Sequence, residues 1–247
     1  MLVLVGLLLS GGATAWAMLA EQETVAEQSY FESISRLDID SGPARVTIRA
    51  GGSDRIVVEE RVGWALGRPA VRKEVKDGAL AVTVGCPRGH QVLGCAVALD
   101  IEVPAATVVH ARNGSGRTEV HGISGETSVE TGSGQVELIA VSGPIWAKGG
   151  SGQILGSKLS APTTRVFSSS AEVVLRYDRA PQSVTARLSS GGLTLTVPDD
   201  HNHYRVDLST ASGHQDVDPS IQDSSAPRSL DVTAASGSVT LSRGGPQ

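Results

Sequence analysis

The sequence predicts an all-β fold: a β-solenoid (β-helix-like) of 18- to 24-residue coils, preceded by one N-terminal apolar helix. Three observations lead to this prediction. The chain of 247 residues contains 29 glycines and only 3% aromatic residues, which suits short strands joined by tight turns. Serines recur every nine residues through its middle, and a fixed period is the mark of repeat architectures. The first twenty residues, by contrast, carry no charged side chain.

The charge balance excludes one class of partner. Lys and Arg number 21 and Asp and Glu number 26, so the net charge is −5. A nucleic-acid binder would show a basic excess, and none is present. Hydrophobic residues make up 40% of the chain, which is enough for a core and too much for a disordered protein.

Residues 1–20 are expected to form a transmembrane signal anchor or a signal peptide. A helix of the eighteen uncharged residues 2–19 spans about 27 Å, close to the hydrocarbon thickness of a bilayer. The anchor is favoured because no basic residue precedes this long apolar stretch. Ala15-Trp16-Ala17 offers a small-x-small cleavage site, so secretion after signal cleavage stays open. A buried core helix is the third alternative.

Residues 21–32 are expected to be a linker, and their charges indicate the orientation. They contain Glu21, Glu23, Glu27 and Glu32, and the first basic residue is Arg36. Basic residues collect on the cytoplasmic side of a membrane, so the C-terminal part is expected outside. This predicts a single-pass membrane protein that contacts the membrane through residues 2–19.

Residues 33–110 are expected to form an N-terminal β cap over the open end of the solenoid, which would otherwise expose a sheet edge. The cap contains the two cysteines, Cys86 and Cys95, which enclose a ten-residue loop. In an exported protein such a pair indicates a disulfide, worth about 2.5–3 kcal/mol by chain entropy. Free thiols, or a metal held with His90, are the alternatives.

Residues 111–242 are expected to form the repetitive β-solenoid. The structural turns of the repeat are Ser115, Gly116, Ser124, Gly125, Ser133, Gly134, Ser142, Gly143, Ser151 and Gly152, and wider coils follow at Ser190-Gly191, Ser212-Gly213 and Ser236-Gly237. The residue before each serine alternates between glycine and an apolar residue, so the full unit is eighteen residues with two strands. Glycine is expected to supply the positive φ of each corner, and the serine hydroxyls to cap turn amides.

Within each unit, the residues three and five positions after the serine are expected to point inward, as Thr118 and Val120 illustrate. After Ser160 this pattern would turn Arg165 into the core, whereas Val166 fits better. The phase therefore slips by one residue, which predicts a bulge or an irregular corner nearby.

A resemblance emerges from the order of these features. A membrane segment is followed by Leu37-Asp-Ile-Asp-Ser-Gly42, by a cysteine pair before a strand ending in Val103-Pro104, and by serial Gly-Ser-Gly turns. Over about residues 33–242 the chain resembles the bacterial putative-adhesin family of envelope proteins, which have a repetitive β-solenoid domain of unknown function. The resemblance implies a non-enzymatic, extracytoplasmic role and offers no catalytic residues to carry over.

No motif predicts catalysis, a cofactor or a metal. The serines recur at a fixed period, whereas a catalytic serine is singular. Gly150-Ser-Gly152 lacks the helix that a phosphate-binding loop needs, and the turns lack the aspartates of calcium-binding nonapeptides. Asp199-Asp-His-Asn-His203 could hold a metal, but a solvated loop between two strands is favoured.

Trp146 is the residue predicted as a partner contact. It lies four residues after Ser142, in a polar outward column with Ser128 and Thr164. An outward tryptophan can anchor a partner. It can also be covered by a loop or by the N-terminal cap, which is the favoured interpretation.

The sequence thus predicts a non-enzymatic, membrane-anchored, extracytoplasmic adhesin-like binding or scaffold module of a bacterial cell envelope. Its partner would be a cell-surface protein or a glycan, without cofactor or nucleic acid. The alternative is a solenoid-type polysaccharide-degrading enzyme. Such an enzyme should concentrate carboxylate, basic and histidine side chains in one groove, and residues 115–170 show no such concentration.

Overall fold

The computed structural model describes residues 22–31, 34–65, 67–86 and 96–244, and they form two large β-sheets that face each other. The sheet of eleven strands has the order β1 (Gln22–Tyr30), β4 (Ile56–Trp64), β7 (Ala96–Pro104), β3 (Arg45–Gly51), β9 (Arg117–His121), β11 (Gln135–Ile139), β13 (Gln153–Leu159), β15 (Glu172–Tyr177), β17 (Leu193–Pro198), β21 (Val239–Gly244) and β19 (Gln215–Val217). The sheet of ten strands has the order β18 (Tyr204–Ser212), β20 (Arg228–Ser236), β16 (Ser183–Leu188), β14 (Thr163–Ser168), β12 (Ile145–Gly149), β10 (Thr127–Thr131), β8 (Val108–Asn113), β2 (Arg36–Asp40), β6 (Ala79–Gly85) and β5 (Ala70–Lys76). One short 3₁₀ turn, η1 (Pro219–Ile221), follows β19.

The strands form because apolar and polar residues alternate along them, so each strand buries one face between the sheets. Thr118, Val120, Val136 and Leu138 are at most 1% exposed, which confirms the inward positions predicted from the repeat. The core is one continuous layer of mainly Val, Leu, Ile and Ala side chains between the two sheets. Because the inner faces fill that layer, recognition is left to the two outer faces and the ends.

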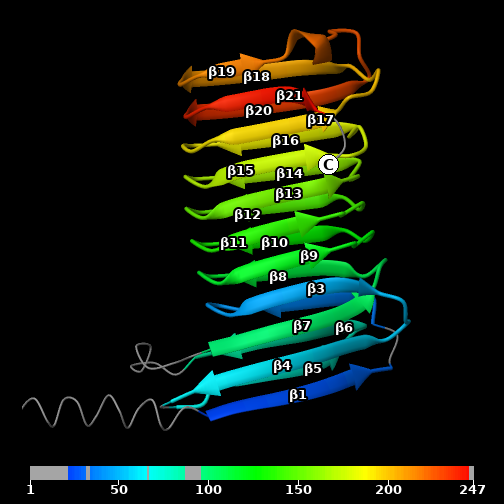
Figure 1. Ribbon diagram of the computed structural model, residues 1–247, viewed down its shortest axis with the longest axis vertical. Coiled ribbons are helices and arrows are strands. Elements are labelled where there is room, and N and C mark those ends of the chain that lie inside the picture. Colours follow the sequence, from blue (N-terminus) through cyan, green and yellow to red (C-terminus); the bar gives the residue numbers. More distant parts are fainter. Residues whose placement is uncertain (1–21, 32–33, 66, 87–95, 245–247) are drawn as a thin grey trace, which may run out of the picture.

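The eighteen-residue unit reappears as the register between neighbouring parallel strands. Gln135 of β11 pairs with Gln153 of β13, and Thr127 of β10 pairs with Ile145 of β12. From β7 onward consecutive strands alternate between the two sheets, so equivalent residues of successive units line up in rows across each sheet. Figure 1 shows the resulting stack of strands, with β1 at one end and β18 and β19 at the other.

The described part of the chain is all-β as predicted, but the predicted β-solenoid is wrong. The described residues form two large mixed sheets, a sandwich-type arrangement, and not a β-solenoid of 18- to 24-residue coils. β4 pairs antiparallel with β1 and β7, and β5 pairs antiparallel with β6. At the other end the last strands insert out of order, with β21 between β17 and β19 and β20 between β16 and β18. A repeat specifies the register of successive units, but residues outside it pair by their own hydrophobic pattern and loop lengths.

The predicted phase slip is confirmed. The register between β13 and β15 shifts between Gly156 and Leu159. Separately, Thr164 of β14 pairs with Ile145 at a separation of nineteen residues instead of eighteen. Ser160 N–H still bonds to Val141 O as Ser142 N–H bonds to Ile123 O, so one extra residue lies between Ser160 and Thr164. Val166 is buried and Arg165 is exposed, as the slip requires.

The repeat glycines are needed for a different reason from the one predicted. Gly116, Gly134 and Gly152 are not among the described residues that have a positive φ. A Cβ on Gly134 would instead lie 2.2 Å from the Gly116 carbonyl oxygen, and a Cβ on Gly152 would lie 1.7 Å from that of Gly134. These corners stack backbone directly on backbone, and only glycine leaves room for that approach.

The left-handed corner of the unit lies elsewhere. Gly122, Ala140 and Lys158 follow one another at intervals of eighteen residues and have φ values of 70°, 54° and 52°. Glycine thus occupies the left-handed position once, and two residues with a Cβ adopt the same conformation in the next two units.

Two predictions fall partly or wholly outside the described residues. The apolar helix over residues 2–19 lies outside them, and so does Cys95. The described residues contain no free cysteine, and the bond between Cys86 and Cys95 stays a prediction. No helix in the described ranges has the length and apolar character that a membrane crossing requires.

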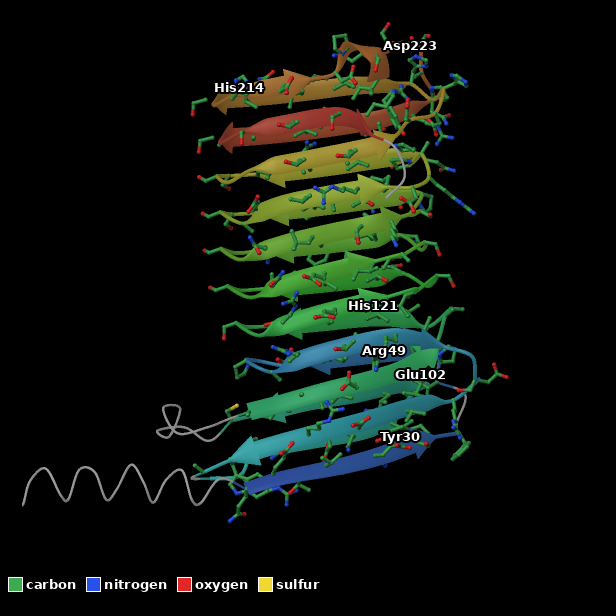
Figure 2. The ribbon with its side chains drawn as sticks, in the orientation of Figure 1. Tyr30, Arg49, Glu102, His121, His214 and Asp223 are labelled. Atoms are coloured by element: carbon green, nitrogen blue, oxygen red, sulfur yellow. The ribbon has the colours of Figure 1, made fainter. Side chains whose placement is uncertain are left out.

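The two ends of the stack are closed differently. Figure 2 places Tyr30 at the end where the chain enters, and His214 and Asp223 at the opposite end. At that far end Arg243 donates hydrogen bonds to backbone oxygens of Pro198, Asp200 and Asn202. These hydrogen bonds hold the Asp199–His203 segment in place.

No group of residues suited to a metal ion occurs in the described part of the chain.

Candidate functional site

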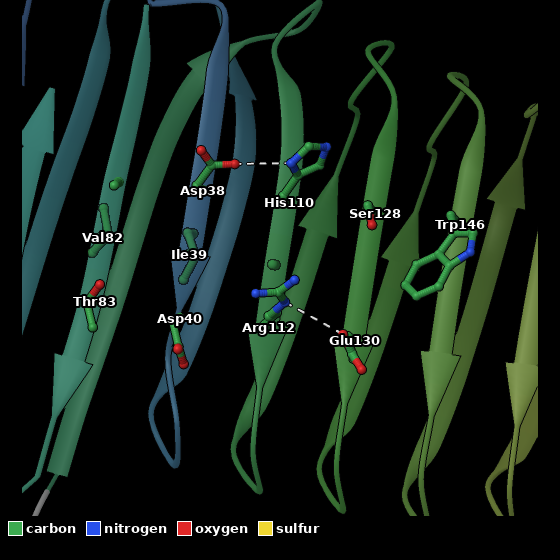
Figure 3. Close-up of a pocket in the computed structure, with 12 residues that line it drawn as sticks. Asp38, Ile39, Asp40, Val82, Thr83, His110, Arg112, Ser128, Glu130 and Trp146 are labelled. Carbon is green, nitrogen blue, oxygen red and sulfur yellow. Dashed lines mark hydrogen bonds and ion pairs between the residues drawn. The ribbon is translucent and has the colours of Figure 1, made fainter. Parts of the chain in front are cut away.

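A groove of about 450 Å³ crosses the outer face of the ten-stranded sheet. It runs over β6, β2, β8, β10 and β12, and Figure 3 shows it from outside. Its polar and aromatic lining comprises Asp38, Asp40, Thr83, His110, Arg112, Ser128, Glu130 and Trp146. Strand alternation turns these side chains outward, while their neighbours Ile39 and Ala111 fill the core.

The lining residues belong to two rows that run across the strands. The Trp146 row consists of Asp38, His110, Ser128, Trp146 and Arg165, which pair in register from β2 to β14. The Phe167 row consists of Asp40, Arg112, Glu130, Lys148, Phe167 and Arg187, which pair from β2 to β16. Neighbours in a row lie one strand spacing apart, about 4.8 Å.

Two of the three carboxylates of the groove, those of Asp38 and Glu130, pair with basic side chains of the same face, whereas Asp40 has no ion pair among the described residues. Asp38 accepts from Arg36 Nε at 3.0 Å, and its other oxygen lies 3.1 Å from His110 Nδ1. Glu130 accepts from Lys148 Nζ at 2.9 Å and lies 3.6 Å from Arg112 Nε. The Arg112 side chain is 78% exposed. Its guanidinium therefore faces solvent over the groove, with donors to spare.

Trp146 forms one wall of the groove, and Phe167 is its ring partner. The rings of Trp146 and Phe167 lie with centroids 6.0 Å apart at a tilted angle of 42°. The neighbour of Trp146 on β10 is Ser128, whose small side chain leaves the indole uncovered on that side. Figure 3 shows the indole extending from β12 towards β10. Phe167 is one of the few large apolar side chains exposed among the described residues.

The surroundings of Trp146 differ in part from the prediction. It lies half-buried in the wall of an open groove, with Phe167 as its ring partner. Ser128 is in its row as expected, but Arg165 takes the place predicted for Thr164. The extra residue that precedes β14 turns Thr164 into the core, where it is 1% exposed.

The rest of the groove cannot be predicted from residues 115–170 alone, because most of its lining lies on β2, β6 and β8. Asp38 and His110 are 72 residues apart and meet only because β2 pairs with β8. The repeat gives no signal for this contact. Counting back from His110 in steps of eighteen passes through Ile56, a core residue of the other sheet, before it reaches Asp38.

Asp38, His110 and Ser128 stand side by side in the order acid, imidazole, hydroxyl, which resembles a nucleophilic triad. Two features count against catalysis. Within the described structure no hydrogen bond joins Ser128 to His110. The backbone of β10 is also paired on both sides, with β8 and with β12, so its N–H groups are engaged and cannot form an oxyanion hole.

The other sites of the molecule are less suited to recognition. A second hollow, of about 510 Å³, is lined by the predicted turn residues Ser115, Gly116, Ser133, Gly134 and Gly152, with the side chains of residues such as Arg45 and Gln135. It is mostly backbone and small side chains. On the same eleven-stranded sheet, Arg49, Glu102 and His121 lie on adjacent strands (Figure 2), and Arg49 pairs with Asp100 at 3.5 Å.

Comparison with known proteins defines the fold more than the chemistry. No protein-family model matches the sequence, and no curated protein matches it. Solved structures do. A putative lipid binding protein from Parabacteroides distasonis is 10% identical with a TM-score of 0.51, covering 90% of this chain and 97% of that chain.

Two further solved structures bear adhesin names. A putative cell adhesion protein from Clostridium sporogenes is 10% identical with a TM-score of 0.38, covering 90% of this chain and 100% of that chain. A putative adhesin from Bacteroides fragilis is 9% identical with a TM-score of 0.38, covering 89% of this chain and 97% of that chain. These names agree with the family that the sequence resembles. At such identities the likeness shows the fold alone, and it is carried by the Parabacteroides distasonis structure.

Proposed function

We propose that this chain is an extracytoplasmic, membrane-anchored, adhesin-like binding module of a bacterial cell envelope, without catalytic activity. Its partner would bind on the outer face of the ten-stranded sheet. The observation that carries the proposal is the Trp146–Phe167 pair: Trp146 lines a groove that also has charged side chains, and Phe167 lies exposed beside it. Aromatic and arginine side chains are the residues on which binding energy concentrates.

The location rests on the sequence. The uncharged stretch 2–19 is followed by glutamates, and Cys86 and Cys95 suit an oxidising compartment. The names of similar structures, adhesins and a lipid binding protein, support a binding role. A lipid as ligand is not favoured, because charged side chains line the groove and the space between the sheets is filled by the core.

The experiment measures binding of the full chain, held in lipid nanodiscs, to isolated wall polysaccharide and surface-protein fractions of a bacterial envelope. Trp146→Ala should weaken binding at least tenfold. Leu155→Ala, a half-buried outward residue of the opposite sheet, is the matched control and should bind as the wild type does. Equal binding by both variants would remove the groove from the proposal.

The enzyme alternative is tested in the same fractions. The row of Asp38, His110 and Ser128 is the observation that favours it. Release of new reducing ends or acyl groups by the wild type, abolished in Ser128→Ala, would establish a hydrolase. Binding without turnover supports the module.

A further inference from the structure

The aromatic pair separates two hollows on the same outer face. The groove lies on the side of β10. On the side of β16 there is a smaller hollow of about 270 Å³, distinct from the one on the eleven-stranded sheet. It is lined by Lys148, Phe167, Ser169, Arg187, Ser189 and Thr233. Lys148, Phe167 and Arg187 are members of the Phe167 row, so the two hollows are successive parts of one track across the strands. Such a track fits an elongated ligand better than a compact one.

From β8 to β16 the basic side chains of the two rows outnumber the acidic ones, since Arg112, Lys148, Arg165 and Arg187 stand against Glu130. The carboxylates of Asp38 and Asp40 lie on β2, outside that stretch. Asp38 and Glu130 are paired with basic side chains. Asp231 accepts hydrogen bonds from both terminal guanidinium nitrogens of Arg187, at 2.8 and 3.1 Å. Arg165, exposed beside Trp146, takes part in no ion pair within the described structure. Together with the outward Arg112 and the 54% exposed Lys148, it offers N–H groups to a ligand. A ligand rich in carboxylate and hydroxyl oxygens would complement this surface.

The spacing of the rows adds a length criterion. Successive side chains of a row are one strand spacing apart, about 4.8 Å. A pyranose ring in an extended polysaccharide advances by a similar length. A polysaccharide lying across the strands would therefore meet one row member with each successive sugar. The C–H face of a sugar also stacks on an aromatic ring, as Trp146 and Phe167 would allow.

From these three features we infer that the ligand is an extended acidic polysaccharide of the polyuronate class, lying across β8 to β16. Its sugar faces contact Trp146 and Phe167, and its carboxylates contact Arg112, Lys148 and Arg165. The inference rests on the proposed function and names the ligand class of that same face.

The experiment titrates the full chain in nanodiscs with polygalacturonate, with neutral dextran as the second probe. Polygalacturonate should bind, and dextran at least tenfold more weakly. Trp146→Ala should weaken polygalacturonate binding about tenfold or more. Arg165→Gln should weaken it several-fold and reduce its salt dependence. Arg45→Gln removes one exposed arginine from the opposite sheet and should stay within twofold of wild type.

The outcomes separate the ligand class from the proposed function. Equal binding of dextran, or equal effects of Arg165→Gln and Arg45→Gln, would overturn the acidic polysaccharide. If polygalacturonate does not bind while a surface-protein fraction still binds through Trp146, the partner is a protein and the binding module stands. If Trp146→Ala changes the binding of no probe, both the ligand class and the proposed binding face are refuted.

Discussion

Tyr177 and Tyr204 are both buried, but their hydroxyl groups have different surroundings. The Tyr177 hydroxyl lies 2.6 Å from Thr164 Oγ1 and so links β15 to β14 of the facing sheet. Among the described residues, the Tyr204 hydroxyl has no hydrogen-bond partner. Burial and, to a smaller extent, the nearby Asp200 carboxylate together raise the pKa of Tyr204 to about 12, against the opposing effect of Arg228 and Arg243. Burial also raises the pKa of Tyr177.

These raised pKa values predict a loss of stability at alkaline pH. The unfolded phenol has a pKa of about 10, so the folded protein holds the proton more tightly. The stabilisation is complete below pH 10 and is lost as the pH rises through the folded pKa of Tyr204, about 12. In urea unfolding across this window, Tyr204→Phe should show a smaller fall in the free energy of unfolding than wild type.

Tyr177→Phe separates the two tyrosines at neutral pH. It should cost about 1 kcal/mol, because the bond with Thr164 is lost. Tyr204→Phe should cost almost nothing at neutral pH, because its hydroxyl has no partner to lose. Identical pH profiles for wild type and Tyr204→Phe above pH 10 would contradict this account.

At the scale of the elements, the two corners of one repeat unit respond to glycine in opposite ways. At Gly134 the need for glycine is one of space, because the carbonyl of the preceding unit lies where a Cβ would be. At Ala140 the constraint is conformational, because its φ of 54° is strained for any residue with a Cβ. Lys158, with a φ of 52° and an exposed side chain, is in the same situation.

Paired substitutions test this assignment. Gly134→Ala should lower the free energy of unfolding by about 1–3 kcal/mol, since backbone must shift to admit the methyl group. Ala140→Gly and Lys158→Gly should each raise it, by up to about 1 kcal/mol, as strain is relieved. Gly52→Ala is the control and should be neutral, because nothing lies within 4 Å of its Cβ position. Urea melts with the same sign at Gly134 and Ala140 would refute the assignment.

These elements also show what the sequence could and could not predict. The nine-residue period predicted the strands from Arg117 to Leu159, their inward residues and the slip after Ser160, because each follows from local alternation. It did not predict which corner is left-handed. Of the three equivalent residues with positive φ, only Gly122 is a glycine, whereas Ala140 and Lys158 give no sign of this conformation in the sequence. The groove depends on Asp38 meeting His110, and a contact over 72 residues cannot be predicted from local alternation.

For the molecule as a whole, the end where the chain enters is closed by an ion pair between the sheets. Glu60 of β4 pairs with Leu99 and Lys73 of β5 pairs with Val82, so both point to the inner side with those core residues. Glu60 Oε2 accepts from Lys73 Nζ at 2.8 Å, and the two side chains are only 14% and 13% exposed. Tyr30 lies near Glu60. Burial raises the pKa of Tyr30, and the Glu60 carboxylate raises it further.

This ion pair predicts a strong coupling between its two residues. Lys73→Met leaves the Glu60 carboxylate unpaired in a poorly solvated place and should cost about 2–4 kcal/mol. Replacing both residues with methionine removes the uncompensated charge, so the double variant should recover most of that loss. Lys148→Met, at the 54% exposed pair with Glu130, should cost at most about 1 kcal/mol. A double-mutant cycle in urea measures the coupling, and additive losses would mean that the ion pair does not hold the two sheets together at this end.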